Sequence, residues 1–287
     1  MADDLGIGKS TDRATACFVG RDSYFAPITQ TYTHMKVLRA ALPLVEPYPD
    51  GVLPITERIP GTAFFPGGDG LWKEEGAIEF PVGGVMVLGH NFDSEKGYHR
   101  SLAVRKENLK GPTWGRLDYL LGSAGIDMKA CFFTNFFMGL KAGDKSTGEF
   151  PGMRDKEFVR RCQQFFLLQV SLMQPRMIIT LGLQVPKLIA PLSEDLACWK
   201  DVRSVEDLDC AAFVNGVKFS DDSYPAIVVG LLHPSFAGMN LRLRNHGGYT
   251  GDQVEHLILM DATSAMLWRE ERPRPDWAKP FLHYDPK

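Results

Sequence analysis

GGVMVLGHNFDS, residues 83–94, is the stretch that decides the fold. The apolar run VMVL at 85–88 lies between glycines, which is typical of a strand buried on both faces of a parallel sheet. A small residue ends the run, and polar side chains follow it directly: His90, Asn91, Asp93 and Ser94. Because ligands of open α/β sheets bind beyond the carboxyl ends of the strands, these polar residues are the first candidates for a functional site.

The composition is that of an ordinary globular protein, with 287 residues of which 44% are hydrophobic and 23% charged. No apolar run is long enough to cross a membrane and the N-terminal residues do not resemble a signal peptide, so we expect a cytoplasmic protein that does not bind membranes. The formal net charge of −3 gives no global support for a nucleic-acid partner. A local basic face would still be enough for phosphate contacts.

Two sequence features argue against metal or nucleotide chemistry. The five cysteines are scattered, odd in number and never in a CxxC pair, so we expect reduced structural thiols and no metal or cofactor: Cys17, Cys131, Cys162, Cys198 and Cys210. GIGKST at residues 6–11 ends like a phosphate-binding loop but lacks the first glycine and a preceding strand. A polar N-terminal segment is the better interpretation.

The rest of the chain predicts an α/β fold. Residues 1–82 form an irregular segment packed on the core, with one helix at 31–44 and then a stretch punctuated by proline and glycine. Further buried strands are expected at 130–138, 176–182 and 226–232, and helices at 114–124, 155–174, 184–190 and 251–270. This alternation predicts a three-layer α/β/α sandwich over residues 83–287 with a central four-stranded parallel sheet. Asp155 is the expected N-cap of its helix, and residues 199–223 are an excursion with short strands.

Three of the expected strands bring polar residues to one edge of the sheet. The first ends in His90 and Asn91, the second contains Asn135, and the fourth leads into His233-Pro234-Ser235. Each has an ordinary structural explanation, because a buried polar group must find a hydrogen bond somewhere. Their occurrence together at one edge favours a functional site.

The order of these segments resembles the uracil-DNA glycosylase superfamily, from residue 83 to about 270. LGHNF at 88–92 resembles its first catalytic motif, TNFF at 134–137 the strand whose Asn reads the base, and HPSF at 233–236 its His-Pro-Ser loop. GPTWGRLDYLLGSAGI at 111–126 and RMIITLG at 176–182 are also similar to segments of the family. Phe92 replaces the usual proline, Asn91 stands where some branches have a carboxylate, and the cysteines of an iron–sulfur cluster are missing. The likeness is therefore to the cluster-free branches with Asn in the first motif.

The resemblance implies a DNA-repair glycosylase that flips a uracil, or a related deaminated base, out of DNA and hydrolyses its N-glycosidic bond. His233 would donate a hydrogen bond to the base as it gains negative charge. Asn91 would orient the attacking water but could not deprotonate it, because an amide takes no proton near neutrality. Asp93 is the alternative residue for activating the water, since it has a carboxylate. Asn135 would read the Watson–Crick edge of the base, and the ring of Trp114 or Phe92 would stack on it. His90 would be a further base-binding residue.

The loop after His233 interleaves apolar and basic residues, as a loop that wedges into DNA would. We expect DNA contacts from Ser235, Phe236, Met239, Leu241, Arg242 and Arg244. The partner would be DNA containing uracil or another deaminated base, bound by a monomer without a metal. Two alternatives stay open: a non-catalytic nucleic-acid-binding protein of the same fold, and a hydrolase of free nucleosides.

Overall fold

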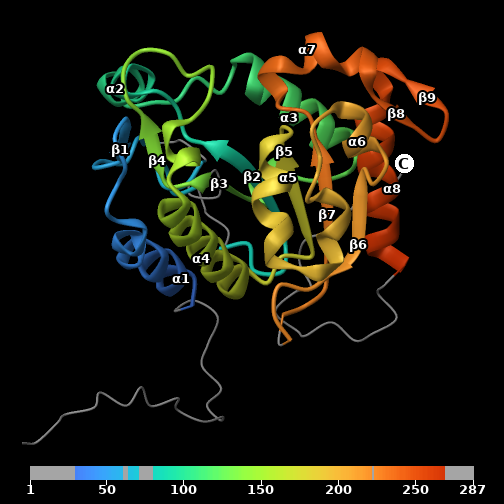
Figure 1. The fold of residues 1–287 in the computed structure, drawn as a ribbon, viewed down its shortest axis with the longest axis horizontal. Coiled ribbons are helices and arrows are strands. Elements are labelled where there is room, and N and C mark those ends of the chain that lie inside the picture. The colour runs from blue at the N-terminus through green and yellow to red at the C-terminus, as the bar shows by residue number, and fades with distance from the viewer. Residues whose placement is uncertain (1–29, 61–63, 71–79, 222, 269–287) are drawn as a thin grey trace, which may run out of the picture.

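The structure is a computed structural model that describes residues 30–60, 64–70, 80–221 and 223–268 (Figure 1). Residues 6–11 and Cys17 lie outside these ranges. The helices are α1 Gln30–Ala40, α2 Glu95–Ala103, α3 Pro112–Ser123, α4 Lys156–Met173, α5 Gln184–Ile189, α6 Val205–Asp209, α7 Ala237–Asn240 and α8 Val254–Trp268. The strands are β1 Val52–Pro54, β2 Val85–Asn91, β3 Cys131–Phe137, β4 Gly139–Lys141, β5 Met177–Leu181, β6 Phe213–Val217, β7 Ala226–Leu231, β8 Asn245–His246 and β9 Tyr249–Thr250.

The central sheet has five strands in the order β3-β2-β5-β7-β6. The four strands expected from the sequence are parallel, as predicted. The expected count of four and the all-parallel sheet are wrong, because β6 adds an edge strand antiparallel to β7. Only residues 218–225 connect β6 to β7. That connection suits an antiparallel pair, since a parallel pair needs a crossover of about a dozen residues or more.

Helices cover both faces of this mixed sheet, an arrangement consistent with three layers (Figure 1). Side chains alternate along β2, as they must in a strand. Met86 and Leu88 pack in the core cluster that contains Phe165 and Phe166 of α4. Val87 packs in the opposite cluster, which contains residues of α3 and α8. Both faces of β2 are therefore buried, as its apolar run predicts.

The long helix α4 begins where its sequence indicates. The carboxylate of Asp155 accepts a hydrogen bond from the backbone N–H of Phe158 at 2.9 Å, which is the geometry of an N-cap. Helix α2 was not expected, because its residues are mostly polar and only Tyr98 among them is buried. Ser94 caps it by accepting from the N–H of Gly97 at 3.2 Å.

The described part of residues 30–82 contacts the core. Met35 and Leu38 of α1 lie in the core cluster on the α4 side of the sheet. Strand β1 pairs antiparallel with β4. Phe65 forms a parallel bridge with Thr134, and its N–H donates to the carbonyl of Phe133 at 2.9 Å, so residues near 65 run beside the outer edge of β3.

Candidate functional site at the carboxyl ends of the strands

The end of β2 carries a histidine and an amide that are hydrogen-bonded to each other. The Oδ1 of Asn91 lies 2.8 Å from the Nδ1 of His90, and the Nδ2 of Asn91 donates to the Asp93 carbonyl at 3.5 Å. With Oδ1 as acceptor, the proton of a neutral His90 is on Nδ1 and its Nε2 is an acceptor. Within the described residues this buried Nε2 has no hydrogen-bond partner.

Burial also sets the protonation state of His90. The ring packs edge-on against Phe137 and Phe150, with centroids 5.1 and 5.8 Å away. Removal from water lowers the pKa of His90 below its ordinary value, and the hydrogen bond to Asn91 offsets this only in part. His90 is therefore a neutral, half-buried imidazole with one acceptor unused.

The carboxylate of Asp93 is directed at the first turn of α2. One oxygen accepts from the N–H of Ser94 at 2.6 Å. The carboxylate also lies against the Cα of Gly97, where an added Cβ would be 2.2 Å from an oxygen. Burial raises the pKa of Asp93 against the opposing effect of the Ser94 hydrogen bonds. The N-cap residue of α2 thus already engages the carboxylate that could replace Asn91.

Asn135 lies beside Gly89, which is its partner in the pairing of β3 with β2. Its side chain is 2% exposed, and Nδ2 donates to the Phe65 carbonyl at 3.2 Å. Its Oδ1 lies directly over Gly89, where a Cβ would come within 2.5 Å of that oxygen. Only glycine leaves room for the amide here, which explains the small residue between Leu88 and His90.

His233 follows β7, and local contacts fix its tautomer. Its Nδ1 accepts the backbone N–H of Ser235 at 3.3 Å. Burial and, to a smaller extent, the nearby His90 together lower the pKa of His233 to about 4. A neutral imidazole whose Nδ1 accepts a hydrogen bond carries its proton on Nε2. His233 is thus a hydrogen-bond donor through Nε2 at neutral pH.

The two aromatic residues expected to stack on a base both pack against other groups of the protein. Trp114 is 3% exposed, its ring lies 5.2 Å from the rings of both Phe64 and Phe133, and its Nε1 donates to Glu107 at 3.0 Å. Core packing therefore covers the ring of Trp114, and the predicted stacking on a base would require Phe64 to move. The ring of Phe92 covers the Cα of Gly67. Sequence reasoning missed Phe64, which borders Gly89; the apolar pair before Pro66-Gly67 was the available signal.

Two residues of the loop after His233 that were expected to contact DNA are buried instead. Leu241 is 5% exposed and packs with Val205 and Leu232, so it cannot wedge between bases. Arg244 is 0% exposed, and its Nε is 2.8 Å from the carboxylate of Asp209. Such a charge is buried because it is paired, and it is not available to a phosphate.

Other residues of this loop are at the surface. Ser235 is exposed, and its hydroxyl lies 2.7 Å from that of Thr113 at the start of α3. Arg242 and Leu243 are exposed in the 3₁₀ turn Leu241–Leu243. The backbones of Phe236 and Met239 belong to the turn Pro234–Phe236 and to α7, and their side chains are outside the described part of the structure.

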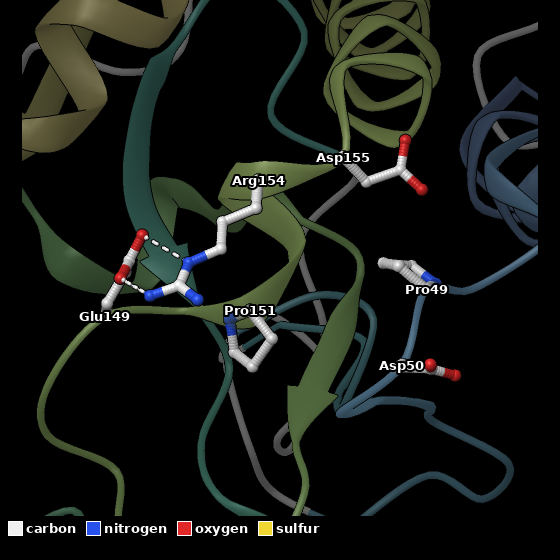
Figure 2. A pocket seen from close by; sticks show the side chains of 6 residues that line it. All are labelled: Pro49, Asp50, Glu149, Pro151, Arg154 and Asp155. Carbon is white, nitrogen blue, oxygen red and sulfur yellow. Dashed lines mark hydrogen bonds and ion pairs between the residues drawn. The ribbon is translucent and has the colours of Figure 1, made fainter.

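A separate surface hollow shares no residue with this edge (Figure 2). It is lined by Pro49, Asp50, Glu149, Pro151, Arg154 and Asp155. Arg154 forms two hydrogen bonds with Glu149, at 3.1 and 2.6 Å, and both side chains are exposed. Asp155 is already engaged as the N-cap of α4. Arg154 and Glu149 thus pair with each other, and Asp155 is engaged by the backbone of its own helix.

The described residues hold neither a cluster of three or more His, Cys, Asp or Glu that could bind a metal, nor a helix able to cross a membrane. Of the cysteines in these ranges, Cys131 and Cys162 are buried, whereas Cys198 and Cys210 are exposed, and all four are free. Compared with known proteins, the chain matches no family model and no curated protein. Any functional assignment therefore depends on the chemistry of the strand ends.

Proposed function

We propose that this protein is a DNA glycosylase that removes uracil or a related deaminated base, with the fold of the uracil-DNA glycosylase superfamily. The observation that carries the proposal is His233, a neutral imidazole whose Nδ1 is occupied by the Ser235 N–H. Its Nε2–H is a donor at the same sheet edge as Asn91 and Asn135. A departing uracil is an anion, and a neutral donor stabilises it without first protonating it.

Hydrolysis of the glycosidic bond passes through a sugar cation and an anionic base. The Nε2–H of His233 would donate to the base oxygen that gains charge. Donors of this kind contribute about 2.7–4 kcal/mol to transition-state stabilisation in oxyanion holes. Water would add its oxygen to C1′ while the bonding electrons leave with the base, and the proton of the water would pass to solvent.

Asn91 would orient that water through its carbonyl oxygen. Its Oδ1 accepts from His90 and retains a second lone pair. An amide cannot take the proton, and the carboxylate of Asp93 is engaged by α2. We therefore propose a slow enzyme that relies on stabilising the leaving base.

Asn135 would read the base. One of its amide hydrogens is used on the Phe65 carbonyl, which leaves the second hydrogen and the Oδ1 lone pairs for the N3–H and O4 of uracil. Cytosine presents the opposite pattern, so a fixed amide rejects it. Because Asn135 is nearly buried, a base would enter by displacing the ring of Phe64 that borders Gly89. Phe64 and Phe92 are the rings available to stack on it.

The basic residues around this edge suit a DNA backbone. Helix α2 lies on one side of the strand ends (Figure 1), and cations of this helix and of the loop after it are exposed: Lys96, Arg100, Arg105, Lys106 and Lys110. Arg242, next to the exposed Leu243, lies in the turn that follows α7, and α7 is on the other side (Figure 1). Local clusters of this kind supply phosphate contacts even when the net charge is negative. Leu243 joins Phe236 and Met239 as a candidate for the wedge role, in place of the buried Leu241.

The test is incubation of the purified protein with a labelled oligonucleotide that carries one uracil, followed by alkali to cut abasic sites. We expect strand cleavage with the wild-type protein and marked loss with Asn91→Ala and His233→Ala. Absence of cleavage on single- and double-stranded substrates, with hypoxanthine and xanthine also tried, would refute the proposal.

A non-catalytic binding protein of the same fold is the second candidate, and the engaged carboxylate of Asp93 beside an amide at position 91 favours it. It predicts retention of uracil-containing DNA in a gel-shift assay without release of the base. Release of the base from a free nucleoside would instead indicate a nucleoside hydrolase.

A further inference from the structure

Glu255 is a fully buried acid whose carboxylate contacts the backbone next to His233. It belongs to α8 and is 0% exposed. Its Oε1 accepts the N–H of Leu232 at 2.6 Å. Strand β7 ends at Leu231, so the Leu232 N–H lies beyond the pairing of the sheet and is bound by the Glu255 side chain instead. The residue held in this way immediately precedes His233.

Two arginines hold the carboxylate of Glu255 from other elements. Arg116 of α3 lies 3.3 Å from Oε2, and the Nη1 of Arg244 lies 4.0 Å from Oε1. Arg244 also donates to the carbonyl of Gly230 in β7 at 3.1 Å and pairs with Asp209. The cluster therefore contacts the backbone of β7 both before and after its last residue.

We propose that Glu255 is a positioning residue that sets the place and tautomer of His233 by fixing the backbone of Leu232. Its effect on base release depends on the function proposed above, whereas its effect on the His233 ring does not. Burial raises the pKa of Glu255, and the two arginines and the Leu232 N–H oppose that rise. The arginines also orient the carboxylate, so that its oxygen remains on the Leu232 N–H. The Thr113–Ser235 hydroxyl contact anchors the other side of the same turn.

The experiment compares the full-length wild-type protein with Glu255→Ala and Glu255→Gln by NMR of labelled histidine and by amide exchange. The glutamine keeps an oxygen that can accept the Leu232 N–H, and the alanine has none. In Glu255→Ala we expect the pKa of His233 to rise from about 4 toward the ordinary 6.5, and the Leu232 amide to exchange rapidly. In Glu255→Gln both should stay close to wild type.

The activity readout separates positioning from general stability. For Glu255→Ala we expect kcat to fall about 10- to 100-fold, with an unchanged KM, since small misplacements of catalytic groups cost rates of that order. Asp209→Asn is the matched control, because it removes a second buried acid that pairs with Arg244 but does not contact Leu232. It should leave the pKa of His233 and the protection of Leu232 unchanged.

An unchanged His233 pKa in folded Glu255→Ala would overturn the proposal, as would equal shifts in Asp209→Asn. If Glu255→Ala does not fold, the exchange rate of the Leu232 amide in the other two proteins tests the proposal. Exchange in the wild-type protein as fast as that of an unstructured amide refutes the anchoring contact. Protection of this amide that is retained in Glu255→Gln supports it. A wild-type protein without base-releasing activity would refute the proposed function and leave the NMR result to test the anchoring.

Discussion

The polar side chains that follow β7 and those that follow β2 differ in their hydrogen bonding. After β7, His233 has one ring nitrogen bonded to Ser235, and a buried glutamate holds the preceding residue. After β2, the amide of Asn91 bonds to His90, and the carboxylate of Asp93 is directed into α2. The first end provides a fixed donor and the second provides no free base. An edge built in this way is better suited to stabilising a leaving anion than to deprotonating water.

The largest effect should come from removing the donor at the β7 end. We expect His233→Ala to lower single-turnover base release by about 10²–10³-fold, as loss of one oxyanion-hole donor does. The matched control is His256→Gln, which alters a histidine of α8 that bonds to Ser123. A loss of less than threefold in His233→Ala, roughly 0.6 kcal/mol, would show that the β7 end is not the stabilising side.

The neutral state of His233 predicts a specific pH dependence of stability. Its pKa is about 4 in the folded protein against 6.5 for an ordinary histidine. Between these values the unfolded chain binds a proton that the folded protein does not, so this contribution to stability is complete above pH 6.5 and is lost as the pH falls toward 4. At the acid end we expect the wild-type protein to have lost about 3 kcal/mol more than His233→Gln in denaturant unfolding. Parallel pH profiles for the two proteins would contradict a buried neutral imidazole.

Supplying a carboxylate at the β2 end should sharpen the contrast between the two ends. We expect Asn91→Asp to raise kcat by about 10-fold or more, because positioned general bases contribute about 10²–10⁴-fold in enzymes. The gain should disappear at low pH, where the new carboxylate is protonated. Asp93→Asn is the comparison variant and should leave kcat nearly unchanged, since α2 already engages that carboxylate. A larger change of kcat in Asp93→Asn than in Asn91→Asp would reverse the roles given to the two residues.

The smallest effect should be on affinity, from the cations beyond β2. We expect Arg105→Gln with Lys106→Gln to weaken DNA binding several-fold and to reduce the slope of log K against log salt by about 2, without changing kcat. Lys129→Gln is the control, because Lys129 is exposed just before β3 and therefore lies at the amino ends of the parallel strands, away from the candidate site. Equal losses from both proteins would show that DNA does not approach the strand ends from this side.

The sequence predicted the elements whose signals are local. The apolar runs of β2, β3, β5 and β7 lie between turn residues, and the N-cap of α4 is visible in Asp155 itself. Strand β6 was not counted, because it is half-exposed at the sheet edge and lacks a continuous apolar run. Its antiparallel direction depends on the short connection to β7.

The errors at the site come from contacts between distant segments. Arg242 and Arg244 are two residues apart and look alike in the sequence. Arg244 is buried and forms ion pairs with Asp209 of α6 and Glu255 of α8, whereas Arg242 is exposed. Trp114 was expected to stack on a base, but Phe64, from a segment far upstream, packs against its ring. The role of Glu255 has no sequence motif, since it depends on where α8 packs against the end of β7.

Direct detection of the released base is the measurement that decides the function. Uracil-containing DNA is incubated under single-turnover conditions with the wild-type protein and with Asn91→Asp, and the free base is quantified by mass spectrometry. We expect one free uracil for each abasic site formed, slowly with wild type and faster with Asn91→Asp. If neither protein releases uracil, hypoxanthine or xanthine while both bind the DNA, the strand ends described here bind DNA without releasing a base, and the glycosylase proposal is wrong.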